Sequence, residues 1–312
     1  MFSTAVLYFL ILLRILNANV LYKEFLRIAI WNSSSGLELK EVCQNDKMDI
    51  LILEGLRVKS MSKGKSHCLK MLPVQNQKFF PHAHRQILDK GKGAVYADYL
   101  EVSELGQVLD ICKQRNVKVL IQVEIRKQIK LTRRQTILMS VLLWNSFLSS
   151  SYYYDRPFGA DFVFDGIHFV HDSGTLNISH NLMKKIRNIS EFEDRRVILS
   201  SESSDIKNVP SESDFVITTA SSINAKSAPK DVPFVIRTTV DELKTFEEFI
   251  DYKMFKGFAT KLNETSRLTI LKYLMTRNSS IFRSGLGFFT VLLALIFILS
   301  LFLFVAGCGC RC

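Results

Sequence analysis

The chain is 312 residues long, which allows at most two domains or one large α/β barrel. Hydrophobic residues make up 47% of it and charged residues 23%, so composition excludes both an intrinsically disordered chain and a polytopic membrane protein. Six cysteines over this length exclude a small disulfide scaffold, and a formal net charge of +11 permits contact with anionic surfaces without indicating a fold.

Residues 1–18 are predicted to form a signal peptide. Ala5 to Leu13 is an apolar run too short to span a bilayer, and Ala18 is a small residue suited to the position before cleavage. No basic residue precedes the apolar run. The alternatives are therefore an N-terminal anchor or a buried segment.

Apolar runs alternate with amphipathic or polar stretches between residues 25 and 262. This alternation predicts an α/β fold in which residues 19–280 form a closed (β/α)8 TIM barrel, with an open doubly wound sheet as the alternative. No Gly-rich phosphate loop follows a strand, which argues against a nucleotide cofactor. The predicted strands are 26–31, 49–53, 117–123, 162–170, 196–200, 215–219, 233–236 and 255–259, and the clearest predicted helices are 105–115, 136–148 and 240–252.

Residues 285–307 are predicted to form a single transmembrane helix after the barrel. The segment carries no charge, and as a helix of about 34 Å it crosses a hydrocarbon core of about 30 Å. With a cleaved signal peptide upstream, the body lies in a lumen or outside the cell, and the short Cys-rich tail 308–312 faces the cytosol. The alternative is a C-terminal signal that is exchanged for a GPI anchor near Asn278.

Glycosylation triplets agree with a body in the secretory pathway. The Asn-X-Ser/Thr pattern marks an acceptor for N-linked sugar in a secreted or lumenal protein. The pattern occurs at Asn32, Asn177, Asn188, Asn263 and Asn278.

Arg156 to Asp172 (RPFGADFVFDGIHFVHD) resembles the fourth strand of class III chitinases, which belong to glycoside hydrolase family 18. Four further pieces resemble the same family in order and spacing: Arg27–Trp31, Leu39–Cys43, Ser66–Cys68 and Ile111–Leu120. The similarity spans roughly residues 25 to 262 and is strongest before residue 175. It implies a TIM barrel and a glycosidase ancestry.

The resemblance implies a four-residue motif on this strand, in which the first Asp is structural and the later acids carry the chemistry. The family motif is DxxDxDxE, whose last three acids alternate along the strand and so point into the barrel. Its Glu is the general acid, and the Asp before it orients the acetamido group whose oxygen acts as nucleophile. Here the positions hold Asp165, His168, Val170 and Asp172. Val170 cannot accept a hydrogen bond and Asp172 is one methylene shorter than Glu, so we expect an inactive barrel.

The resemblance also indicates substrate-binding candidates at other strand ends. Glu124 follows the third strand, and Thr219 and Ser221 follow the sixth. Lys261 follows the eighth strand, where the family usually has a Trp beneath the sugar. Glu54 and Glu124 are either a new pair of carboxylates or loop acids in water.

A disulfide between Cys43 and Cys112 is implied by the same resemblance. The family partner of Cys68 is absent, which leaves Cys68 as a thiol. A Cys43–Cys68 bond is the alternative, because the residues alone show only that one of the three body cysteines is left over.

We therefore expect a membrane-anchored, chitinase-like protein that is inactive and binds glycan or protein at the carboxyl ends of its strands. Chitin or another N-acetylglucosamine-containing glycan is the expected sugar. The alternatives are an active chitinase or endo-N-acetylglucosaminidase acting on β-1,4 N-acetylglucosamine linkages, and a structural ectodomain without sugar binding. The basic run 126–134 is either a solvated loop or a contact for a phospholipid, an anionic glycan or a protein. No cofactor, metal ion or nucleic acid is expected.

Overall fold

The computed structural model describes residues 26–45, 48–61, 66–72, 84–87, 94–99, 102–150, 156–203, 209–223, 231–237 and 254–262. The predicted signal peptide 1–18, helix 240–252, transmembrane segment 285–307, tail 308–312, Asn263 and Asn278 lie outside these residues. Within the described part of the chain, no helix is both long and apolar enough to cross a membrane.

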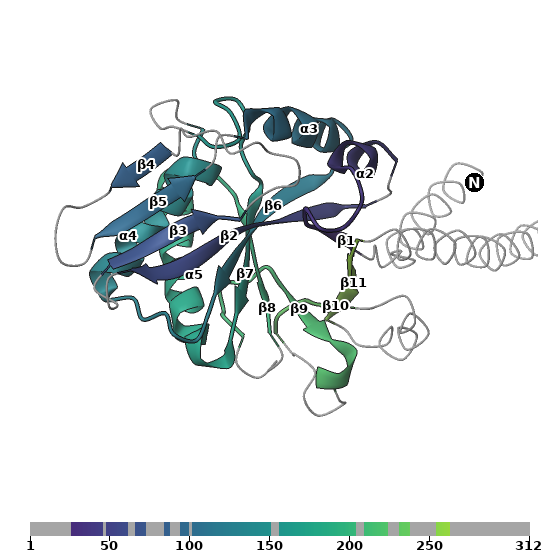
Figure 1. Ribbon diagram of the computed structural model, residues 1–312. Coiled ribbons are helices and arrows are strands. Elements are labelled where there is room, and N and C mark those ends of the chain that lie inside the picture. Colours follow the sequence, from purple (N-terminus) through teal and green to yellow (C-terminus); the bar gives the residue numbers. More distant parts are fainter. Residues whose placement is uncertain are drawn as a thin grey trace, which may run out of the picture. The chain divides into compact units, whose positions relative to one another are not determined.

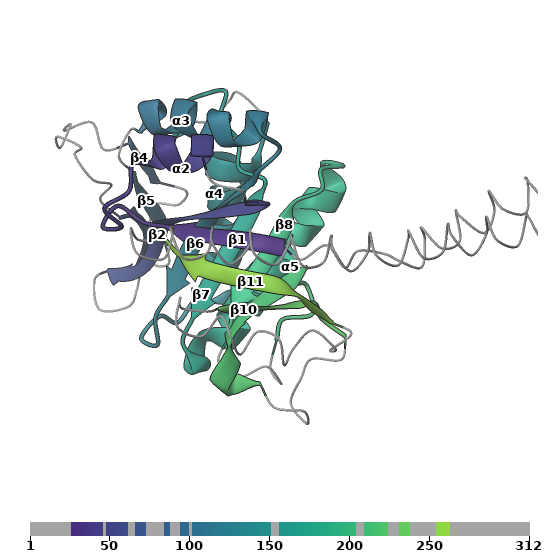
Figure 2. The ribbon, with the colours of Figure 1, turned by 90° about the vertical axis from the view of Figure 1, so that its right-hand side faces the viewer.

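Eight parallel strands of the described residues close into a barrel (Figures 1 and 2). Closure comes from β1, which pairs with β11 on one side and with β2 on the other. The predicted barrel is confirmed and the open sheet is excluded. In barrel order the strands are β1 (Leu26–Trp31), β2 (Ile50–Met61), β6 (Lys118–Ile125), β7 (Gly166–His171), β8 (Ile198–Glu202), β9 (Phe215–Thr219), β10 (Phe234–Arg237) and β11 (Phe255–Lys261).

The barrel interior is filled with branched apolar side chains. Ile30, Ile52 and Leu120 belong to one buried cluster with Ile217 and Val235. These residues come from five strands, and bulky branched side chains of this kind pack a closed barrel solidly. The strands therefore form a packed core below their carboxyl ends.

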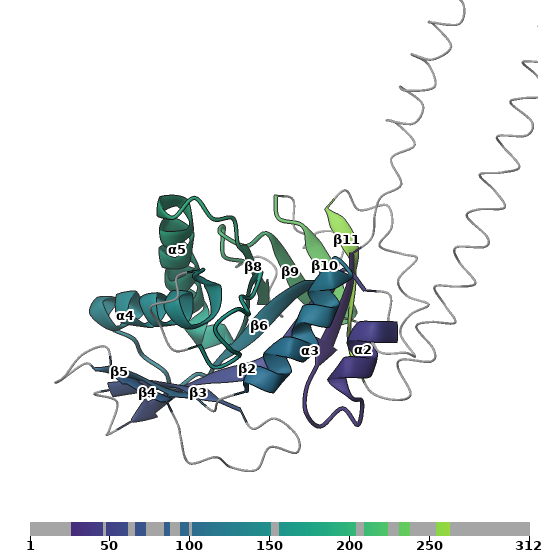
Figure 3. The same ribbon diagram turned by 90° about the horizontal axis from the view of Figure 1, so that it is seen from above.

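The described helices lie outside the strands (Figure 3). Outward-facing side chains of β2, β6 and β7 pack against them in a second buried cluster. Helix α4 starts at Arg133 because Thr132 and Gln135 cap each other, each side chain bonding the other's backbone N–H. The helices are α2 (Leu39–Asn45), α3 (Ser103–Gln114), α4 (Arg133–Leu143), which runs on into the π-helical turn η2 (Trp144–Leu148), and α5 (Leu176–Phe192).

A disulfide between Cys43 and Cys112 joins α2 to α3. Both cysteines are completely buried, and Arg115 Nη1 donates a hydrogen bond to Cys43 O at 2.9 Å beside them. The bonded pair is the one that the family resemblance implies. Cys68 keeps its thiol and is buried in β3 (Ser66–Met71).

Three further strands extend the sheet beyond the barrel. The second half of β2 pairs antiparallel with β3 (Ser66–Met71), which pairs with β5 (Val95–Tyr99), and β5 pairs with β4 (His84–Ile87). The prediction of a short strand at 49–53 was wrong in length, and the sequence analysis contained none of these three strands. Tyr99 packs edge-on against Phe147 of η2, with the two ring centroids 5.4 Å apart. The extension therefore packs into the same buried cluster as the helices outside the barrel.

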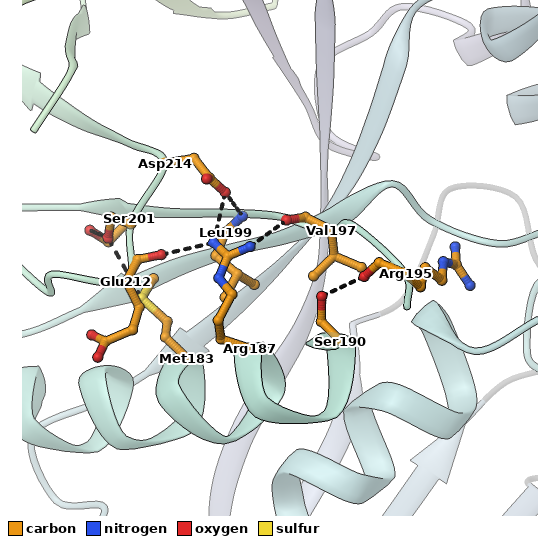
Figure 4. Close-up of polar contacts among 10 residues, drawn as sticks. Met183, Arg187, Ser190, Arg195, Val197, Leu199, Ser201, Glu212 and Asp214 are labelled. Carbon is orange, nitrogen blue, oxygen red and sulfur yellow. Dashed lines mark hydrogen bonds and ion pairs between the residues drawn. The ribbon is translucent and has the colours of Figure 1, made fainter. Parts of the chain in front are cut away.

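Arg187 fastens α5 to the amino ends of β8 and β9 (Figure 4). Its Nη1 donates to Val197 O at 2.9 Å, and its Nη2 donates to Glu212 O and to Asp214 Oδ2 at 3.0 Å each. Asp214 Oδ2 also accepts the backbone N–H of Leu199 at 2.8 Å. The cluster stabilises the end of the barrel opposite the strand carboxyl ends.

Candidate functional site

The candidate site is the mouth of the barrel, defined here as the carboxyl ends of the eight strands and the residues that directly follow them. This face carries the chemistry in enzymes of this architecture. Side chains alternate along a strand, so residues two or four positions beyond the buried interior layer also point inward. The inward residues at this level are Glu54, Glu124, Val170, Glu202, Thr219, Arg237 and Lys261.

Asp165 lies at the end of the barrel opposite the mouth. It precedes β7, and its Oδ2 accepts the backbone N–H of Val119 at 2.9 Å. Lys113 Nζ and Lys118 Nζ lie 3.6 and 3.7 Å from its carboxylate oxygens. The structure therefore gives Asp165 a structural position and does not bring it together with the other three motif residues.

His168 is completely buried in the barrel interior. Its Nδ1 hydrogen-bonds with Ser200 Oγ of β8 at 3.0 Å. The Nε2 atom of His168 lies 3.8 Å from Oε2 of Glu202, which is also on β8. The side chain of His168 therefore lies in the buried layer beneath the mouth.

Val170 and Asp172 stand where the resemblance puts the orienting Asp and the acid. Val170 lies between Glu124 of β6 and Glu202 of β8 in the strand register. Asp172 is exposed just beyond β7, and its Oδ2 accepts the backbone N–H of Lys127 at 2.8 Å. The carboxylate is thus hydrogen-bonded to the loop that follows β6.

Glu202 is held by a cation across the mouth. Arg237 Nη1 of β10 donates to Glu202 Oε1, so the pair passes over β9. Burial opposes ionisation of Glu202, but the contacts with His168 and Arg237 outweigh it and hold its pKa below the usual value. Glu202 is therefore a carboxylate at neutral pH.

Glu124 is held by two arginines. Arg57 Nε donates to its Oε2 at 2.5 Å and Arg126 Nε donates to its Oε1 at 2.7 Å. A register shift after Glu54 in β2 brings Arg57 opposite Glu124. Burial opposes ionisation, but the hydrogen bonds from Arg126 and Arg57 outweigh it and hold the pKa of Glu124 below the usual value.

Glu54 completes a third charged group. Lys261 Nζ of β11 lies 3.0 Å from Glu54 Oε1, and Asn32 Nδ2 donates to Glu54 Oε2 at 3.0 Å. Glu54 and Glu124 are therefore each bound to a basic side chain, and neither is an acid surrounded by water alone. Lys261 reaches across β1 at the position where the resemblance expects an aromatic floor.

Thr219 and Ser221 lie at the end of β9. Thr219 Oγ1 is 3.2 Å from Ser221 Oγ and 2.7 Å from Ser222 Oγ. The three hydroxyls form an exposed cluster on the short helix η5 (Ala220–Ser222) and the strand before it. They offer sugar-type hydrogen bonds but no charge.

The structure describes three of the five glycosylation triplets. Asn177 and Asn188 are exposed on α5. The side chain of Asn32 is bound to Glu54 in the mouth. Within the described ranges, no three His, Cys, Asp or Glu side chains are grouped so that they could hold a metal ion.

No family model matches the chain, and no curated protein matches it. Several solved structures have a similar fold. A chitinase from Ipomoea carnea has 15% identity and a TM-score of 0.55, covering 78% of this chain and 98% of its own. Concanavalin B has 15% identity and a TM-score of 0.59, covering 80% and 99%. A xylanase–α-amylase inhibitor protein in complex with trehalose has 16% identity and a TM-score of 0.56, covering 78% and 96%.

The described body of the chain is a TIM barrel, and its fold is similar to that of these solved structures. At these identities the likeness concerns the fold, and the residues of the mouth decide what the fold can do.

Sequence reasoning missed Glu202, Arg57 and Arg237. Glu202 follows two Ser residues at the end of a strand, and the alternation of side chains along that strand predicts that Glu202 points inward. The pairing with Arg237 was not available, because the two residues belong to strands that are not neighbours.

Proposed function

We propose that the chain is a membrane-anchored, chitinase-like protein of the secretory pathway that lacks hydrolase activity and binds glycan or protein at the mouth. One observation carries the inactivity. Asp172, at the acid position, is one methylene shorter than Glu, and its carboxylate is bound to the backbone N–H of Lys127. A general acid has to lie within hydrogen-bond reach of the oxygen it protonates.

Two other carboxylates of the mouth, Glu124 and Glu202, do not replace Asp172. A glycosidase acid needs a raised pKa so that it holds a proton near neutral pH. Glu124 and Glu202 have lowered pKa values, because bound arginines favour their ionised forms. Val170 supplies nothing to orient an acetamido group. These features together support loss of catalysis.

A binding role at the mouth has support from its chemistry and from one structural neighbour. The mouth presents hydroxyl, carboxylate and guanidinium groups, which are the groups that bind sugar hydroxyls or a charged partner. The inhibitor protein of similar fold was solved with trehalose. Chitin or another N-acetylglucosamine-containing glycan is the proposed sugar. The membrane anchor and the lumenal or extracellular body rest on segments 1–18 and 285–307, with a GPI anchor as the alternative.

The test is binding and cleavage of chitin hexasaccharide by the full chain, produced through a secretory route and purified in detergent. Calorimetry measures binding, and mass spectrometry of the reaction mixture measures product. We expect binding without product. Product with turnover contradicts the proposed inactivity and makes Asp172→Asn the first variant to assay. A folded sample that neither binds nor cleaves contradicts glycan binding and leaves a protein partner.

A further inference from the structure

The loop between β6 and α4, residues 126–134, carries a run of basic residues on the mouth face. Five of these nine residues are Lys or Arg, and no Asp or Glu occurs between Glu124 and Asp155. We call residues 126–134 the basic loop. Lys127, Lys130 and Arg133 are exposed, and none of them forms an ion pair with another residue of the described part of the chain.

The backbone of the basic loop is fixed at several points. Asp172 accepts the N–H of Lys127 at 2.8 Å, and Ile129 N donates to Arg126 O at 2.9 Å in a turn. The Ile129 side chain is 3% exposed and belongs to the outer core. Thr132 then caps α4. The loop is therefore preorganised, and its charges keep their spacing when a ligand binds.

The position of two arginines opposes the stability of α4. Arg133 and Arg134 occupy the first turn of the helix, where the positive end of the helix dipole disfavours cations, and this turn has no acidic residue. A bound anion removes the conflict, because both the arginines and the helix terminus attract it.

The ligand chemistry follows from what surrounds these charges. A protein partner is usually anchored by buried apolar or aromatic residues, and of the large apolar side chains in the described residues only Ile137 and Phe192 are exposed. Anionic lipid is concentrated on the cytoplasmic leaflet, which the proposed lumenal or extracellular body does not meet. A hydrated polymer with repeated negative groups needs charges at fixed spacing and no apolar anchor.

We propose that the basic loop binds an anionic polysaccharide, with sulfate or carboxylate groups contacting Lys127, Lys130 and Arg133. This inference rests on the proposed non-catalytic, glycan-binding function and names the class of glycan. Asp172, at the position of the lost acid, becomes a positioning residue for the loop that makes the contacts.

The experiment measures binding of full chain in detergent to heparin, to chitin hexasaccharide and to phosphatidylserine vesicles. The variant Lys127→Gln/Lys130→Gln/Arg133→Gln removes three charges from the loop. The variant Lys40→Gln/Lys184→Gln/Arg196→Gln removes three exposed charges from elsewhere. We expect heparin binding that weakens with salt, a loss of about tenfold or more in the loop variant, and little change in the control. Thermal melting of the loop variant should be unchanged or slightly raised, whereas a structural role would lower it.

Each other outcome overturns the inference in a recognisable way. Equal losses in both variants mean that net charge alone attracts heparin. Binding to chitin hexasaccharide without heparin binding leaves the proposed function standing and rejects the basic loop as its site. Vesicle binding that is lost in the loop variant and kept in the control variant, without heparin binding, identifies a lipid surface instead. Binding to none of the three probes rejects both the basic loop as a polysaccharide site and glycan binding at the mouth, and leaves a protein partner as the proposed ligand.

Discussion

Val170 is a small apolar side chain between two ionised carboxylates, Glu124 and Glu202. An acid at this position would place a third negative charge among them, and each of the two present carboxylates already has its own arginine. An uncharged valine at position 170 therefore avoids adding a carboxylate that would have no basic partner of its own.

Glu202 should make stability depend on pH. Its pKa is lowered in the folded state, so the unfolded chain binds a proton at higher pH, and the stabilisation is present above pH 4.5 and lost as pH falls below it. We expect thermal unfolding of the full chain in detergent to shift to lower temperature between about pH 5 and pH 3. Glu202→Gln should be less stable at pH 7 and show a weaker shift.

The matched control for this prediction is Glu191→Gln, on the exposed end of α5. It should retain the full pH dependence. An unchanged slope in Glu202→Gln would mean that Glu202 has an ordinary pKa and that Arg237 does not hold it.

At the scale of elements, β7 and β8 approach so closely at Gly166 that no side chain fits. A Cβ at Gly166 would lie 1.9 Å from Ile198 O. Gly166→Ala must push the two strands apart, and overpacking of this kind costs about 1–3 kcal/mol or more. We expect a lower denaturation midpoint in urea. Gly174→Ala is the control, because its nearest contact would be the flexible Lys127 side chain at 3.4 Å. Equal midpoints for the two variants would contradict the close approach.

The disulfide between α2 and α3 closes a loop of 69 residues. Constraint of the unfolded chain over this length contributes about 4 kcal/mol. Cys43→Ala/Cys112→Ala should lower the free energy of unfolding by that order in urea denaturation, and reduction of the wild-type chain should do the same. Cys68→Ala should stay sensitive to reduction. Loss of that sensitivity in Cys68→Ala would support the alternative Cys43–Cys68 bond.

Strands with long apolar runs were predictable from the sequence, whereas those of the extension were not. Residues 117–123 read as a buried strand because Val, Leu and Ile follow one another in the barrel wall. In β3, by contrast, Ser66 and His67 are buried beside Lys70, which is exposed. Such mixed segments become strands through their neighbours, and pairing with β2 overrides their weak local preference.

At the scale of the whole molecule, the mouth is made by residues that only the closed barrel brings together. Asp172 and Val170 were found from one local motif. The partners of Glu54, Glu124 and Glu202 come from other strands, and two of the three pairs pass over an intervening strand. Local sequence does not specify contacts of this kind, so the charge network was the part of the site that sequence reasoning lacked.

This network leads us to expect that restoring the motif does not restore catalysis. Val170→Asp/Asp172→Glu recreates two family residues, but the ion pairs of Glu54, Glu124 and Glu202 remain at the mouth. Mass spectrometry should detect no product from chitin hexasaccharide incubated with this variant. An active chitinase under the same conditions controls for the assay. Product formation would mean that the loss of activity was confined to β7.

The pairing of β1 with β11 also sets an order of events during synthesis. Leu26 pairs with Gly257, and a ribosome adding about 5–20 residues per second needs roughly 10–50 s to make the chain between them. Until then the edge of β1 that receives β11 has no partner strand, and contacts of such sequence separation slow folding. The barrel of the nascent chain therefore cannot close between β1 and β11 until β11 has been synthesised.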